Sequence, residues 1–146
     1  DVHLLIVGQK GWYYKEIIDG IDSLSSRDKI KLVGPVYGED LVGVYQLATI
    51  MAYPSMFEGF GYPVLEAMRL GTPVLTSNIS SMPEVGGNAA HYANPESLDD
   101  IKDGLCKLLN DKNYREKLAV KGTRYAAGFN TMRMAQETLE VYRKLI

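Results

Sequence analysis

Short apolar runs alternate along the chain with stretches in which apolar residues recur at every third or fourth position. Runs of the first kind, bounded by Gly or Pro, are typical of buried parallel strands. They predict five strands, at residues 2–7, 30–33, 50–53, 73–76 and the very short 91–93. Stretches of the second kind are typical of amphipathic helices. They predict helices at residues 12–24, 39–48, 63–71, 98–108, 111–125 and 134–145.

Strands that alternate with helices predict βαβ units, and hence a parallel sheet with right-handed crossovers. We therefore expect one α/β domain over residues 1–146, a Rossmann-like open parallel sheet flanked by helices. In such sheets ligands bind outside the carboxyl ends of the strands. The loops after Val7, Val33, Tyr53 and Thr76 are expected to converge on one crevice.

Composition narrows the function classes. The formal net charge is −2 and no basic stripe occurs, which argues against a nucleic-acid partner. Cys106 is the one cysteine, so neither a disulfide within the chain nor a cysteine-based metal site is expected. No apolar run has the length of a membrane span. The chain opens on Asp1 without a methionine, and we expect it to be a piece of a longer protein.

The candidate chemistry lies at residues 57–68, where Glu58 and Glu66 stand eight positions apart. Gly59 and Gly61 bracket a turn in which the backbone can approach a ligand closely. Pro63 suits the first turn of a helix, where its missing N–H costs nothing. The free N–H groups at that helix start favour an anion, and Glu66 can reach hydroxyl groups beside it. Phosphate next to hydroxyls indicates a nucleotide-sugar.

A simpler interpretation makes Glu58 a solvated loop acid and Glu66 a partner of the helix dipole, worth about 0.3–1 kcal/mol. That interpretation would be favoured for an arbitrary pair of glutamates. Here the pair lies between a strand followed by Pro-Ser and a Gly-x-Gly helix entry, which favours ligand binding.

The wider sequence resembles a known family. In order along the chain stand Tyr53-Pro54-Ser55, Glu58-Gly59-Phe60-Gly61, Pro63-Val64-Leu65-Glu66-Ala67-Met68, Gly71-Thr72-Pro73-Val74 and Pro83-Glu84-Val85. These motifs resemble the C-terminal donor-binding domain of retaining glycosyltransferases of the two-Rossmann (GT-B) fold, family 4, also called glycosyl transferases group 1. The resemblance covers nearly the whole chain.

The resemblance implies a role for each matching residue. Glu58 would contact hydroxyls of the transferred sugar and is the candidate catalytic residue, whereas Glu66 would hold the ribose. Backbone amides of Gly59, Phe60, Gly61 and Tyr62 would bind the sugar and the diphosphate, and Val36 would border the base. The resemblance implies no metal and no cofactor besides the donor. It places an Arg and a Lys that neutralise the diphosphate upstream of this chain.

The implied function is transfer of a hexose, with retention, from a nucleoside diphosphate sugar to a saccharide or lipid-linked hydroxyl acceptor. The acceptor would bind through an N-terminal domain that this chain lacks, so the chain alone is expected to be inactive. The resemblance implies a cytoplasmic enzyme and allows peripheral association with the inner face of the membrane. The rival functions are a non-catalytic nucleotide- or phospholigand-binding module and half of a sugar-nucleotide epimerase. The nucleotide, the sugar, the acceptor and the oligomeric state stay open.

Three further sites carry alternatives. Trp12 is expected in the core rather than in the wall of the donor crevice. Glu84 is equally suited to capping the turn that follows it and to lining the site. His3 and His91 lack the spacing of a metal pair and are expected to be structural.

Overall fold

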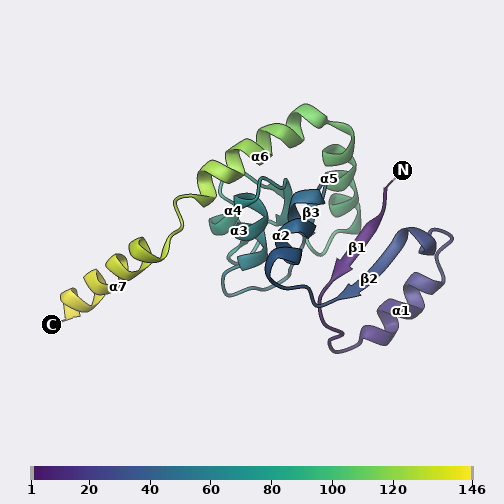
Figure 1. Ribbon diagram of the computed structural model, residues 1–146, viewed down its shortest axis with the longest axis horizontal. Coiled ribbons are helices and arrows are strands. Elements are labelled where there is room, and N and C mark those ends of the chain that lie inside the picture. Colours follow the sequence, from purple (N-terminus) through teal and green to yellow (C-terminus); the bar gives the residue numbers. More distant parts are fainter. Residues whose placement is uncertain (1, 146) are drawn as a thin grey trace. The chain divides into compact units, whose positions relative to one another are not determined.

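The computed structural model describes residues 2–145, which form two compact units (Figure 1). Unit 1 runs to Val42 and unit 2 begins at Gly43, so that the boundary falls inside helix α2 (Gly38–Leu47). Each unit is built on its own parallel sheet.

Unit 1 is a single βαβ crossover. Strand β1 (Leu4–Val7) leads through α1 (Tyr14–Asp22) and the 3-10 turn η1 (Arg27–Lys29) to β2 (Ile30–Gly34). The two strands pair in parallel, with an irregularity between Ile6 and Val7. The expectation that β1 is buried on both faces was wrong. Leu4 of β1 is 51% exposed, and the sheet of this unit consists of β1 and β2 alone among the described residues. Trp12 is 94% exposed, so its predicted core packing was also wrong.

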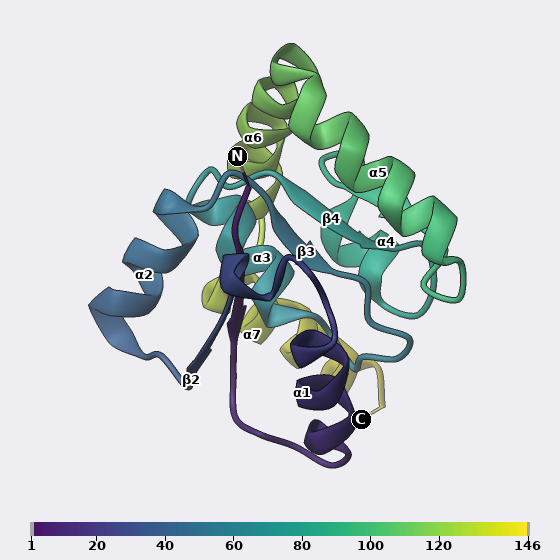
Figure 2. The same ribbon diagram turned by 90° about the vertical axis from the view of Figure 1, so that its right-hand side faces the viewer.

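Unit 2 carries the larger part of the fold. Its elements follow in the order β3 (Met51–Tyr53), α3 (Tyr62–Arg69), β4 (Val74–Ser77), α4 (Met82–Gly86), β5 (His91–Ala93), α5 (Leu98–Asn110), α6 (Lys112–Ala126) and α7 (Thr131–Leu145). The three strands pair in parallel in the order β3-β4-β5. Helices α5 and α6 lie side by side in both ribbon views (Figure 2).

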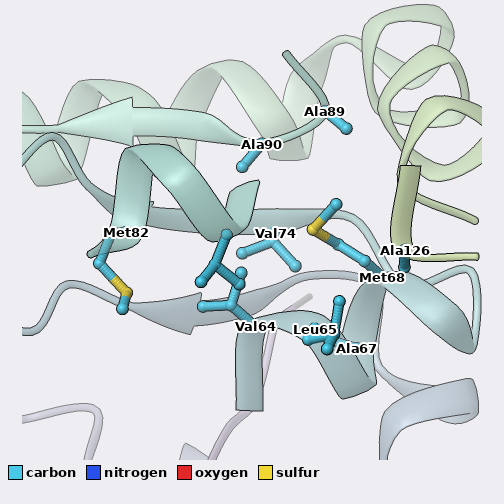
Figure 3. Packing of buried hydrophobic residues seen from close by; sticks show 10 residues of the cluster. Val64, Leu65, Ala67, Met68, Val74, Met82, Ala89, Ala90 and Ala126 are labelled. Carbon is cyan, nitrogen blue, oxygen red and sulfur yellow. The ribbon is translucent and has the colours of Figure 1, made fainter. Parts of the chain in front are cut away.

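Strand β4 is the centre of unit 2, and all four of its residues are buried. Because side chains alternate along a strand, Val74 and Leu75 point to opposite faces. Val74 packs in a cluster with Val64 and Met68 of α3 and with Met82 of α4 (Figure 3). Leu75 packs in a second cluster with Ala93, Leu108 and Leu118. The sheet therefore has helices on both faces, as an α/β layer requires.

Close packing of α3 against α6 depends on a small residue. A Cβ at Gly122 would lie 3.3 Å from Cγ of Met68, so an alanine there would require Met68 to shift by a few tenths of an ångström. The hydroxyl of Thr123 lies 3.1 Å from the carbonyl of Ala119 in its own helix and 3.3 Å from the carbonyl of Met68. The second contact lies at the carboxyl end of α3, the helix that carries Glu66.

The sequence prediction of an α/β chain with parallel strands flanked by helices is confirmed. The predicted strand at residues 73–76 is found one residue later, as Val74–Ser77. The five strands form one two-stranded and one three-stranded sheet in the described part of the chain, where a single sheet was expected.

Candidate functional site

The loop between β3 and α3 enters the helix through a strained backbone. Gly61 precedes the helix with φ 115° and ψ 49°, a conformation that L side chains rarely adopt. A Cβ at this position would also lie 2.4 Å from the terminal methyl of Met82. Pro63 occupies the first turn of the helix, as the sequence suggested. Glycine at position 61 is therefore favoured by the turn, and a Cβ there would also displace the end of the Met82 side chain.

This helix entry presents unused donors. The carbonyl of Gly61 accepts hydrogen bonds from the N–H groups of Val64 and Leu65. Within residues 2–145, no protein acceptor is found for the N–H groups of the four residues from Gly59 to Tyr62. Gly59 and Tyr62 are exposed. Free N–H groups at the positive end of a helix attract anions, and the anion site expected from the sequence stays a prediction.

Glu58 is half-buried beside this loop, and its carboxylate is held at one oxygen. Its Oε1 accepts hydrogen bonds from the hydroxyl of Tyr53 at 2.6 Å and from that of Ser55 at 3.0 Å. Within the described residues, Oε2 has no protein donor. Burial, followed by the bond to Glu58, raises the pKa of Tyr53 to about 12, so this phenol stays protonated and can donate at neutral pH.

The backbone of Glu58 is held by the loop that follows β4. The hydroxyl of Ser80 accepts from the N–H of Glu58 at 3.2 Å and donates to its carbonyl at 2.9 Å. The hydroxyl of Ser81 lies 2.9 Å from the same carbonyl and 2.7 Å from that of Phe60. Ser80 reaches this position with φ 58°, in the left-handed region that disfavours a side chain. The structure thus keeps a strained residue where it holds Glu58.

Glu66 lies on the exposed side of α3 and has its own tyrosine partner. The hydroxyl of Tyr45 donates to Oε2 of Glu66 at 3.1 Å. The backbone carbonyl of Tyr45 accepts from the hydroxyl of Thr72 at 2.7 Å, which fixes the position of the tyrosine. Burial and the negative charge of Glu66 raise the pKa of Tyr45. Each of the two candidate glutamates is therefore bound by a tyrosine.

The structure brings most of the predicted site residues together in unit 2. Glu58, Glu66 and the segment from Gly59 to Tyr62 follow one another through the loop and into α3. Val36 lies in unit 1, between β2 and α2, and its contact with a base stays a prediction. The sequence did not single out Tyr45 and Tyr53 as partners of the glutamates. The available signal was that Tyr53 ends a strand five residues before Glu58.

The remaining candidates are structural or stay open. His91 is half-buried with Nδ1 3.0 Å from the hydroxyl of Tyr114, and burial lowers its pKa, which fits the structural role expected for it. Glu84 lies in the first turn of α4, where no capping hydrogen bond is made by a side chain. No cluster of three potential metal ligands occurs among residues 2–145. None of the helices in this range combines the length and apolar character that a membrane crossing demands.

The chain is similar in sequence to known mannosyltransferases. It is 34% identical over 142 residues to the O-antigen chain mannosyltransferase B of Escherichia coli, covering 97% of this chain and 37% of the relative. It is 31% identical over 130 residues to the MMP alpha-(1->4)-mannosyltransferase of Mycolicibacterium hassiacum, covering 86% of this chain and 32% of the relative. The chain thus spans about a third of the length of both proteins.

Solved structures share the fold over nearly the whole chain. A structure of Anabaena Alr3699/HepE in complex with UDP and glucose superposes with a TM-score of 0.87 at 20% identity, covering 98% of this chain and 41% of that protein. Sucrose-phosphate synthase from Thermosynechococcus elongatus superposes with a TM-score of 0.84 at 24% identity, with coverage of 98% and 38%. The family model described as Glycosyl transferases group 1 matches residues 1–125. The chain belongs to the glycosyl transferases group 1 family.

Proposed function

We propose that this chain is the donor-binding, C-terminal half of an enzyme that transfers a hexose, with retention, from a nucleoside diphosphate sugar to a hydroxyl acceptor. The observation that supports it most is the arrangement around the helix entry. Free N–H groups from Gly59 to Tyr62 lie between two glutamates whose carboxylates can accept from hydroxyls. A donor of this class presents a diphosphate between two polyhydroxylated groups, the hexose and the ribose.

In this proposal the two glutamates divide the donor between them. Glu58 binds hydroxyls of the hexose through its free Oε2, and Glu66 binds the ribose. The N–H groups and the dipole of α3 stabilise the negative charge that grows on the departing diphosphate. This role needs no metal ion, and we propose a metal-independent reaction. Upstream basic side chains would add to the stabilisation.

The transfer breaks the bond between the anomeric carbon and the diphosphate oxygen and forms one between that carbon and the acceptor oxygen. The proton of the acceptor hydroxyl passes to the departing diphosphate. Because the proposal assigns Glu66 to the ribose, Glu58 is the one of these two glutamates that it assigns to the sugar. A covalent scheme with two carboxylates, as in retaining glycosidases, is therefore not part of the proposal. Retention follows if the acceptor attacks the face from which the diphosphate leaves.

Binding measurements on the full-length protein test this division. The probes are GDP-mannose and UDP-glucose, each paired with its free nucleotide; mannose comes first because the relatives described above are mannosyltransferases. Glu66→Gln should weaken the binding of nucleotide and of nucleotide-sugar alike by about 1 kcal/mol, because the amide keeps an acceptor but loses the charge that strengthens the hydrogen bond. Glu58→Gln should weaken the binding of the nucleotide-sugar and leave the binding of the free nucleotide unchanged. Glu116→Gln, at an exposed site on α6, is the matched control and should change neither.

Other outcomes would decide against the proposal. Equal effects of Glu58→Gln and Glu66→Gln on free nucleotide would contradict the division and favour a nucleotide-binding module. Loss of donor binding in EDTA, restored by Mg²⁺, would contradict metal independence. Transfer of the hexose with inverted anomeric configuration, read by proton NMR of the glycosylated acceptor, would refute retention.

A further inference from the structure

We propose that Tyr53 and Ser55 are positioning residues for Glu58, which bind one oxygen of its carboxylate and thereby present the other to the hexose. This inference rests on the proposed function, in which Glu58 contacts the transferred sugar. Oε1 accepts from Tyr53 at 2.6 Å and from Ser55 at 3.0 Å. Within residues 2–145 no protein group donates to Oε2, so that oxygen can accept from a ligand.

Tyr53 is itself rigidly placed. It is the last residue of β3, and its carbonyl accepts from the hydroxyl of Thr76 on the neighbouring strand at 2.9 Å. Its ring packs against the core cluster around Val64 and Val74. The phenol oxygen is therefore carried by a strand and a packed ring, and it can hold a flexible glutamate side chain in one orientation.

Ser55 completes the hold from the loop. Its hydroxyl lies 3.0 Å from Oε1 of Glu58 and 3.3 Å from the carbonyl of Phe57. One hydroxyl proton serves one acceptor at a time, and the shorter bond to a charged carboxylate is the stronger of the two. Two donors on a single oxygen restrict the rotation of the carboxylate, which one donor would allow.

The main chain of Glu58 is fixed as well. Ser80 binds both its N–H and its carbonyl, and Ser81 reaches the same carbonyl. With the backbone and Oε1 both held, Glu58 has lost side-chain freedom before any ligand arrives. Binding then orders fewer groups, so the contact with the hexose is stronger than that of a free glutamate.

Tyr45 offers an internal comparison, because it makes the equivalent bond to Glu66. If each tyrosine acts through its own glutamate, the two Tyr→Phe changes should affect different parts of the donor. Tyr92 offers a structural control. Its hydroxyl donates to the carbonyl of Gly87 at 2.7 Å in the same unit, and neither glutamate is among its partners.

The test compares dissociation constants for GDP and GDP-mannose, and for UDP and UDP-glucose, by calorimetry on the full-length protein. The dissociation constant of the free nucleotide divided by that of its nucleotide-sugar measures the contribution of the hexose to binding. This ratio is larger when the hexose adds more to the affinity. Tyr53→Phe keeps the packed ring and removes the hydroxyl. It should reduce this ratio by about 3- to 10-fold, the scale of one hydrogen bond, and leave nucleotide affinity unchanged.

Companion variants separate positioning from stability. Adding Ser55→Ala to Tyr53→Phe should reduce the ratio further. Tyr45→Phe should weaken nucleotide and nucleotide-sugar equally, so that the ratio stays the same. Tyr92→Phe should leave every dissociation constant unchanged, although it removes a half-buried, hydrogen-bonded hydroxyl from the same unit.

The outcomes distinguish the inference from the function on which it rests. If Glu58→Gln reduces the ratio but Tyr53→Phe does not, the inference is overturned and the proposed function stands. If Tyr53→Phe weakens nucleotide and nucleotide-sugar equally, Tyr53 has only a structural role and the inference is again overturned. If Glu58→Gln itself leaves the ratio unchanged, the assignment of Glu58 to the hexose fails, and the inference fails with it.

Discussion

Replacing Gly61 by alanine tests the link between the helix entry and the core. Two costs add at this position. The φ of 115° is strained for any residue with a Cβ, which costs about 1–2 kcal/mol. The new Cβ would lie 2.4 Å from the terminal methyl of Met82. Met82 is fully buried, so its side chain must repack within the core, at about 1–3 kcal/mol. We expect Gly61→Ala to lower the free energy of unfolding by about 2–5 kcal/mol.

Gly59 provides the matched control, two residues earlier in the same loop. A Cβ there would meet no atom within 4 Å, and its φ is not in the positive range. Gly59→Ala should be neutral, or stabilising by up to about 1 kcal/mol, because alanine restricts the unfolded chain. Urea unfolding followed by circular dichroism measures both variants. A midpoint shift without a change in slope shows that stability changed, not the surface exposed on unfolding.

A double-mutant cycle separates the two costs. Met82→Ala removes the methyl that Gly61→Ala would displace, so the double variant should lose less stability than the sum of the single variants. The difference should equal the packing part, about 1–3 kcal/mol. The reasoning is refuted if Gly61→Ala stays within about 0.5 kcal/mol of the wild type, or if Gly59→Ala is equally destabilising.

Two further predictions concern stability. Ser80→Ala should lower the free energy of unfolding by about 0.5–1.5 kcal/mol, because the hydrogen bonds to Glu58 are lost. Ser80→Gly loses the same bonds but should recover about 1 kcal/mol, because glycine adopts the positive φ without strain. A larger loss for glycine than for alanine in urea unfolding would contradict this. The pKa values of Tyr53 and Tyr92 are raised from 10.0 to about 12, mainly by burial. The stability that their protonated hydroxyls add to the folded state is therefore complete below pH 10 and is lost as the pH rises through 12. The urea concentration at the unfolding midpoint should fall between pH 10 and pH 12, and it should fall less steeply with pH in Tyr92→Phe. An equal dependence on pH in the wild type and the variant would argue against a raised pKa at Tyr92.

Local sequence signals predicted the elements of unit 2 except α4 (Met82–Gly86), a five-residue helix for which no helix was expected. The apolar run at residues 73–76 and the glycine-bracketed entry at residues 59–63 each carry their own structural cause, burial on both faces and backbone freedom. In unit 1 the same kind of signal predicted burial of β1 that the structure does not show. An apolar run reveals that a strand can be buried, but not how many neighbours it has.

The site was predictable as a set of residues but not as a set of contacts. The spacing of Glu58 and Glu66 was visible in the sequence, and so was the glycine-bracketed turn between them. The bond from Tyr45 to Glu66 joins residues 21 positions apart, and its formation depends on the packing of two helices. The positive φ of Ser80 was also hidden, because serine carries no preference for that conformation. Such details are set by tertiary structure.

The central position of β4 has a consequence for how unit 2 folds. Its pairs with the flanking strands join residues close in sequence: Met51 with Val74, 23 residues apart, and Leu75 with His91, 16 residues apart. Closing such short loops costs little chain entropy, and a low contact order favours rapid folding. Every pairing of this sheet is available once residue 93 has been synthesised. On the ribosome, the strand pairings that involve Tyr53 can therefore form before the last three helices, α5 to α7, are complete.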